Sequence, residues 1–202
     1  MKLFFSPTSP YVRKVMIAAH ELNLADRIEK VTAAASPINR NPNIIVHNPL
    51  GQVPTLITDD GQMLADSRVI CEYLDHLGGG GKLFPRNSSR WQAIVDQAMA
   101  DGILAAALLA RYETALRPGD KLWPEWLAGQ MDKIKTTLAS LDAAAPRFAD
   151  RCDIGTISYA CALSYLDLRF AAFDWRSACP AAAVWHKAFE THPSLVATKL
   201  VG

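Results

Sequence analysis

The sequence predicts a small α/β domain followed by an all-helical domain. Strand and helix patterns alternate at the start of the chain, whereas only helical patterns occur later. Alanine follows the same division, since only 7 of the 31 alanines lie in the first 80 residues. Four consecutive glycines and a proline in the segment Gly78–Arg86 end a helix and oppose its continuation. We therefore place the domains at 1–78 and 87–202, with a linker at 79–86.

The first domain is expected to begin with a β-α-β unit. Lys2–Phe5 is a short apolar strand, and Ser9 followed by Pro10 is typical of a helix cap and a first helical residue. Apolar residues then recur at helical spacing as far as Leu22. Ile28–Val31 completes the unit as a second strand.

A β-β-α unit is expected after a loop rich in proline and asparagine. Thr55–Ile57 and Gln62–Leu64 flank an Asp-Asp-Gly turn, which favours a tight hairpin. Asp66 then caps a helix whose apolar positions follow helical spacing until the glycines. The second domain is expected to be a bundle of four helices. They are predicted at Trp91–Arg117, Pro124–Ala144, Ile154–Phe173 and Pro180–Glu190.

Composition excludes several classes of protein. The 202 residues, 50% hydrophobic and 20% charged, are typical of a soluble globular protein. The 21 basic and 20 acidic residues are balanced, so no nucleic-acid partner is expected. The N-terminus lacks the apolar region of a signal peptide, which predicts a cytoplasmic location. The longest apolar run, Ile103–Ala110, has eight residues, so no membrane contact is expected.

The cysteines and histidines predict no metal site. None of the four cysteines forms a CxxC pair, and none of the five histidines has ligand spacing, so we expect reduced thiols. The cysteines are Cys71, Cys152, Cys161 and Cys179.

Three short segments contain residues suited to binding a ligand. The Ser9 hydroxyl lies at the positive end of a helix, where a thiolate is stabilised. The N–H and C=O of Val53 would face outward and pair with a peptide-like ligand if the bond to Pro54 were cis. The segment Asp66-Ser67 opens a helix that could hold a carboxylate. Each segment, taken alone, is also explained by an ordinary structural role. Two of them are typical helix caps, and the third is typical of a proline on an edge strand.

Together these segments resemble the cytosolic glutathione transferases over essentially the whole chain. The matching segments are Ser9-Pro10-Tyr11, Pro49–Leu56 and Leu64–Ile70. The resemblance implies a thioredoxin-like first domain, a homodimer, and glutathione as a co-substrate without any other cofactor. It also implies that the Val53-Pro54 bond is cis.

The resemblance also assigns roles within the site. Val53, with Pro54 beside it, would pair with the cysteinyl unit of glutathione, and Asp66 and Ser67 would receive its γ-glutamyl group. Ser9 would donate a hydrogen bond to the thiolate and lower the thiol pKa. Nearby Ser6 and Thr8 are alternative hydroxyls. No cysteine lies at residues 6–12, which disfavours mixed-disulfide chemistry.

Two positions depart from the family pattern. Gln52 stands where a lysine often reaches the ligand, and it can donate a hydrogen bond but carries no charge, so we expect a modest affinity for glutathione. The usual Ser/Thr-x-x-Asp capping box has its residue types exchanged, to Asp153 and Thr156. The short Thr156 side chain is not expected to reach back to the cap, which would weaken the helix.

The expected reaction is nucleophilic attack by the glutathione thiolate on a small hydrophobic electrophile. The electrophile is expected to bind between the domains, with Tyr11, Arg111 and Tyr112 as the polar candidates, although tyrosine at helical spacing is also typical of packing. Two alternatives remain open on this fold. One is a non-catalytic interaction protein similar to the stringent-starvation proteins, and the other is a glutathione-dependent lyase, isomerase or peroxidase.

Overall fold

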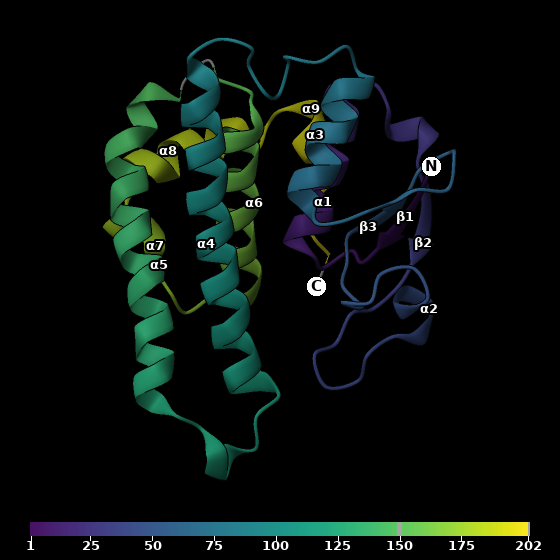
Figure 1. Cartoon of the computed structure of the whole chain (residues 1–202). Coiled ribbons are helices and arrows are strands. Elements are labelled where there is room, and N and C mark those ends of the chain that lie inside the picture. The colour runs from purple at the N-terminus through teal and green to yellow at the C-terminus, as the bar shows by residue number, and fades with distance from the viewer. Residues whose placement is uncertain (149–150, 202) are drawn as a thin grey trace. The chain divides into compact units, whose positions relative to one another are not determined.

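The chain forms two compact units in the computed structural model, which describes residues 1–148 and 151–201 (Figure 1). The first unit comprises residues 1–90 together with the segment from Pro193 onward, and the second comprises residues 91–192. The polypeptide therefore leaves the first unit, forms the whole second unit, and returns.

The first unit is built on a four-stranded sheet in the order β2-β1-β3-β4. β1 is parallel to β2 and antiparallel to β3, and β3 and β4 form the predicted hairpin. Leu3 and Leu56, which face each other across β1 and β3, are fully buried and anchor the sheet to its core. The strands are β1 (Lys2–Phe5), β2 (Glu29–Thr32), β3 (Thr55–Ile57) and β4 (Met63–Leu64).

Helices α1 and α3 pack together in the first unit, as their apolar faces predict. The short helices α2 and α9 were not predicted, because four residues are too few to show helical periodicity. The helices are α1 (Pro10–Glu21), α2 (Pro42–Ile45), α3 (Ser67–Leu77) and α9 (Pro193–Val196).

The C-terminal segment belongs to the first unit, although the sequence analysis assigned it to the helical domain. α9 packs on α1, and the Arg13 guanidinium donates a hydrogen bond of 3.3 Å to the Leu195 carbonyl. Farther along, the Val201 N–H donates to the Pro7 carbonyl at 3.3 Å. These contacts join residues far apart in the sequence, which local patterns do not reveal.

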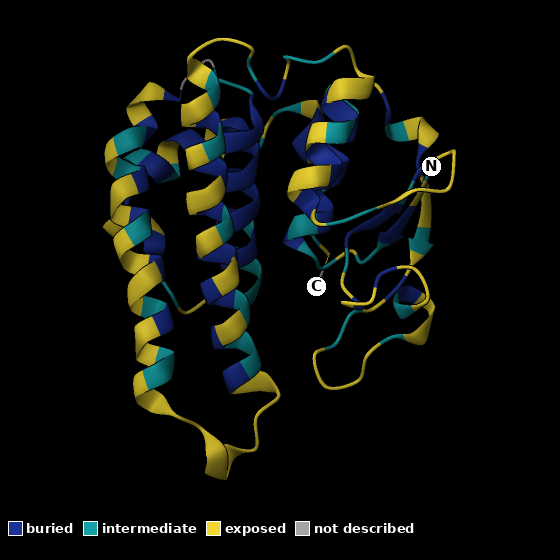
Figure 2. Ribbon diagram, viewed as in Figure 1, coloured by how far each residue is buried: buried dark blue, intermediate teal, exposed yellow. Residues whose placement is uncertain are grey.

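The second unit is helical, as predicted, with small shifts at the helix ends. α6 ends at Arg169 rather than Phe173, and a short extra helix, α7, follows it. Figure 2 shows that α6 is buried along nearly its whole length and forms the centre of this unit. The helices are α4 (Ser89–Ala115), α5 (Pro124–Ala144), α6 (Ile154–Arg169), α7 (Trp175–Ala178) and α8 (Pro180–Phe189).

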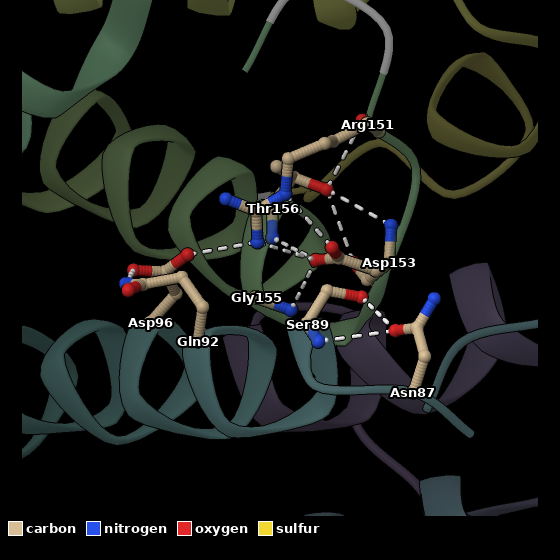
Figure 3. A network of polar contacts seen from close by, with 8 residues as sticks. All are labelled: Asn87, Ser89, Gln92, Asp96, Arg151, Asp153, Gly155 and Thr156. Atoms are coloured by element: carbon tan, nitrogen blue, oxygen red, sulfur yellow. Dashed lines mark hydrogen bonds and ion pairs between the residues drawn. The ribbon is translucent and has the colours of Figure 1, made fainter. Parts of the chain in front are cut away.

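The capping box at the start of α6 is complete, which corrects our expectation (Figure 3). The Asp153 carboxylate accepts from the Thr156 N–H at 3.2 Å, and the Thr156 hydroxyl accepts from the Asp153 N–H at 3.1 Å. Threonine reaches the cap because its hydroxyl folds back over the preceding turn, where it also lies 3.3 Å from the Arg151 carbonyl. Both orphan donors are satisfied.

The start of α6 is fixed to α4 by charge and by close approach (Figure 3). The Arg151 guanidinium lies 2.8 Å from the Asp96 carboxylate on α4 and 2.9 Å from that of Asp153. A Cβ atom added at Gly155 would lie 2.6 Å from the Asp96 Cβ and 2.9 Å from the Ala93 carbonyl. Only glycine fits at this contact.

Helix α4 is apolar on more than one face. By length and composition it could cross a membrane, with a mean hydropathy of 1.6 in its most apolar window, half of which is buried inside the structure. The core helix of a non-membrane protein has the same properties.

Candidate functional site

The Ser9 side chain caps α1, as its sequence context predicts. Its hydroxyl oxygen accepts a hydrogen bond of 3.3 Å from the Val12 N–H, and Pro10 is the first helical residue. Within the described chain, no acceptor takes the hydrogen of the Ser9 hydroxyl. The alternatives Ser6 and Thr8 lie 3.3 Å apart and form a hydrogen bond to each other. Ser9 therefore has a donor to offer at the positive end of a helix.

A buried hydrogen-bond network shapes the loop before β3. Asn48 accepts from the Leu50 N–H at 3.0 Å and donates to the Thr55 hydroxyl at 2.8 Å. That hydroxyl in turn donates to the Gln52 carbonyl at 2.8 Å. Asn48 and Thr55 are buried while the Gln52 side chain is exposed. The network holds the loop from the inside and leaves its outer edge open.

The outer edge of this loop presents the backbone of Val53. The Val53-Pro54 peptide bond is cis, as the resemblance implies. Neither the N–H nor the C=O of Val53 is paired within residues 1–148 and 151–201. Val53 is half-buried and Pro54 is buried. An extended ligand could therefore form a donor and an acceptor bond with a single residue.

Asp66 and Ser67 open α3, and Asp66 is held in its charged form. The Asp66 carboxylate accepts from the Arg68 N–H at 2.9 Å, and the Arg68 guanidinium lies 2.9 Å from its other oxygen. Partial burial raises the pKa of Asp66, but the hydrogen bonds from Arg68 and the positive charge of Lys14 outweigh it and hold the pKa below its usual value. Ser67 is buried, and the Ala65-Asp66 peptide bond is cis.

The strand register brings these three segments to one edge of the sheet. β1 pairs with β3 through Phe4 and Thr55, so the Ser9 segment that follows β1 starts beside Pro54. β3 pairs with β4 through Leu56 and Leu64, and continuing this register by two positions sets Pro54 opposite Asp66. The edge therefore offers a hydroxyl donor, an open backbone and a carboxylate to one ligand.

The residues expected to bind the electrophile belong to different units. Tyr11 is half-buried in α1, with the Lys14 ammonium 5.6 Å from its ring centre. Arg111 and Tyr112 are half-buried at the end of α4, and burial raises the pKa of Tyr112 against the opposing charge of Arg111. The interdomain pocket stays a prediction.

Two further polar residues, Tyr165 and Arg169 on α6, act near that end of α4 and were not predicted. Tyr165 is buried in α6, and the charges of both Arg111 and Arg169 act on its phenol. The four-residue spacing of Tyr165 and Arg169 places both on one face of a helix, which is the signal that could have identified them.

Comparisons with known proteins agree with this geometry. A family model of the glutathione S-transferase N-terminal domain matches residues 8–77, and a model of the C-terminal domain matches residues 124–188. The uncharacterized GST-like protein YibF of Escherichia coli K12 is 34% identical over 181 residues, covering 87% of this chain and 86% of YibF.

Solved structures show the same similarity. A glutathione transferase family member from Pseudomonas fluorescens Pf-5, with bound glutathione, is 44% identical with a TM-score of 0.97, covering 100% of this chain and 99% of its own. A second structure from this organism holds S-(propanoic acid)-glutathione and is 44% identical, with a TM-score of 0.92 and complete coverage of both chains. With both of its domain models matched, the chain belongs to the glutathione S-transferase family.

Proposed function

We propose that the protein is a glutathione transferase that conjugates the glutathione thiolate to a small hydrophobic electrophile. The observation that carries this proposal is the convergence of the Ser9 hydroxyl, the unpaired Val53 backbone and the Asp66 carboxylate at one sheet edge. The relatives that hold glutathione or a glutathione thioether support it.

Each group of glutathione has a complementary partner at this edge. The ammonium of the γ-glutamyl unit suits the ionised Asp66, and its carboxylate suits the N-terminus of α3 at Ser67. The cysteinyl N–H and C=O match the unpaired groups of Val53. Gln52 is exposed beside them and can donate to a carboxylate of the peptide.

Ser9 would act on the sulfur without taking its proton. A serine hydroxyl is too weak a base to deprotonate a thiol, but it stabilises the thiolate by donating a hydrogen bond, helped by the positive end of α1. The thiol proton passes to solvent, the sulfur lone pair forms the bond to the electrophilic carbon, and a leaving group or a conjugated π bond takes the displaced electron pair.

The proposal is tested by measuring glutathione binding, thiolate formation and conjugation. Glutathione binding is measured by calorimetry, and thiolate formation by its ultraviolet absorbance between about pH 5 and 8. Ser9→Ala should lower conjugation of an aryl halide by about 100-fold and leave glutathione bound with a raised thiol pKa. Ser67→Ala should weaken glutathione binding itself. Ser6→Ala and Thr8→Val are the matched controls.

Other outcomes contradict specific parts of the proposal. Unchanged kinetics in Ser9→Ala would remove its role, and a loss in Thr8→Val would move the role to that hydroxyl. Failure of the wild type to bind glutathione would favour an interaction protein on this fold. Turnover of a hydroperoxide without any conjugation of aryl halides would favour a peroxidase.

We also propose that two copies associate through the exposed face of α4. Trp91, Val95, Met99 and Leu109 are all exposed and lie on one side of this helix, with 72% of Trp91 accessible. Gly102 lies on the same side, with open space beyond its backbone, so a second helix can approach closely.

The oligomeric state tests this proposal. Sedimentation velocity should show a dimer that Val95→Glu dissociates. Binding of the wild type to lipid vesicles, without dimers, would overturn this proposal.

A further inference from the structure

Helices α4 and α6 meet near their N-terminal ends, and four polar residues lie near their C-terminal ends. The helices run side by side in the same direction (Figure 1) and meet at Asp96 and Gly155. Arg111 lies 15 residues beyond Asp96, and Arg169 lies 14 residues beyond Gly155. At about 1.5 Å per residue, Arg111 lies about 22.5 Å and Arg169 about 21 Å along its helix, so both are at nearly the same level.

The charges of both arginines act on one buried phenol, that of Tyr165. Burial raises the pKa of Tyr165, and the positive charges of Arg111 and Arg169 oppose that rise. Arg169 also lies within hydrogen-bonding reach of the Tyr165 hydroxyl, and Tyr112 is the remaining neighbour. The cluster is therefore positive, with two phenolic hydroxyls beside two guanidinium groups.

This cluster has unsatisfied donors. The Nε atom of Arg169 is buried and has no hydrogen-bond partner. Within residues 1–148 and 151–201, neither Arg111 nor Arg169 forms an ion pair, whereas Arg151, Arg117 and Arg176 in the same unit each pair with a carboxylate. A buried donor without an acceptor is costly, because it has lost its hydrogen bonds to water. The cluster thus lacks a negatively charged acceptor.

We propose that Arg111 and Arg169, with the hydroxyls of Tyr112 and Tyr165, bind a carboxylate group of the electrophilic substrate. A planar carboxylate accepts two parallel hydrogen bonds from a guanidinium and fills its remaining oxygen sites with hydroxyl donors. The proposal rests on the proposed transferase function, because that function identifies the ligand as an electrophile. It narrows the substrate to an apolar electrophile that carries a carboxylate away from its reacting carbon.

Direct binding tests the carboxylate site without glutathione. The probes are 4-chloro-3-nitrobenzoate and 4-chloro-3-nitrobenzamide, which differ in one charged group. Calorimetry should show that the wild type binds the benzoate at least about tenfold more tightly than the amide. Arg169→Gln and Arg111→Gln should each lose this preference. Lys135→Gln, which removes an exposed charge from α5, should retain it.

Conjugation tests the role of the cluster in the reaction. For each probe, kcat/KM is divided by the uncatalysed rate with glutathione, which corrects for their different reactivities. Arg169→Gln should lower the ratio for the benzoate by about tenfold and leave that for the amide unchanged. Its melting temperature should not fall, because the side chain that is removed has no ion-pair partner.

The outcomes separate this proposal from the transferase function. Equal binding of benzoate and amide by the wild type, or unchanged benzoate binding in both arginine variants, would overturn the carboxylate site. A selective loss of benzoate binding in those variants would support the site even if glutathione did not bind. Conjugation of both probes at equal corrected rates would leave the transferase function standing and refute the carboxylate site.

Discussion

The two units of the molecule position their polar side chains by different means. In the first unit, the loop before β3 is shaped by contacts between residues close in sequence, and Asn48, for example, donates to the Thr55 hydroxyl seven positions away. In the second unit, the Arg151 guanidinium contacts Asp96, 55 residues away. Local contacts shape the loop that presents the Val53 backbone, whereas a distant contact fixes one helix against another. Changes in this loop should therefore affect binding, and changes where α6 meets α4 should affect stability.

The largest effect is expected where α6 touches α4. Gly155→Ala places a Cβ atom 2.6 Å from the Asp96 Cβ, so the helices must separate. We expect a loss of about 3 kcal/mol in the free energy of unfolding, measured in urea. Gly129→Ala on α5 is the control, because its new methyl group meets open space. It should stabilise the protein by up to about 1 kcal/mol. Equal effects of the two changes would refute the close approach.

A smaller loss is expected from the ion pairs at the same place. Arg151→Met keeps the aliphatic stem but removes the contacts with Asp96 and Asp153. We expect a loss of about 2 kcal/mol, because the Arg151 side chain is one-quarter exposed and its partners retain some solvent. Adding Asp96→Asn should recover part of it by removing the isolated charge. A further loss in the double variant would show that Asp96 has another role.

A change inside the first unit should separate binding from stability. Thr55→Val removes the hydroxyl that accepts from Asn48 and donates to the Gln52 carbonyl. The loop carrying Val53 then loses its internal support. Glutathione affinity, measured by calorimetry, should therefore fall about fivefold, while the free energy of unfolding changes by about 1 kcal/mol. Thr136→Val, on the exposed surface of α5, is the control. Unchanged affinity would mean that the loop holds its shape without this network.

The last prediction concerns the ionisation of the tyrosines in the second unit, which has the smallest effect at neutral pH. Burial and the nearby Asp96 charge raise the pKa of Tyr159 to about 12, and burial also raises those of Tyr112 and Tyr165. An unfolded tyrosine ionises near pH 10, so this contribution to stability is complete below about pH 10 and is lost as pH rises towards 12. Absorbance at alkaline pH should show a late tyrosine step that Tyr159→Phe removes. An ordinary titration of every tyrosine would contradict the burial.

The sequence revealed those parts of the structure that depend on neighbouring residues. The caps at Ser9 and Asp66 were predicted because each cap side chain and the backbone N–H that donates to it lie within one turn. The reciprocal cap at Thr156 was misjudged because side-chain length was considered without the rotamer that turns its hydroxyl back.

Other features could not be predicted because they depend on the folded arrangement. Arg169 looks like an ordinary last-turn arginine in the sequence, and only the fold shows that its Nε is buried without a partner. The return of the segment from Pro193 to the first unit depends on contacts such as that between Arg13 and Leu195, which no local pattern encodes.

That returning segment has a consequence for how the protein is made. A ribosome synthesises residues 1–90 first, but α1 lacks its covering helix α9 until the segment from Pro193 emerges. The second unit is continuous, so it can fold while its neighbour is still incomplete. The unit that carries the candidate glutathione site begins synthesis first and finishes folding last.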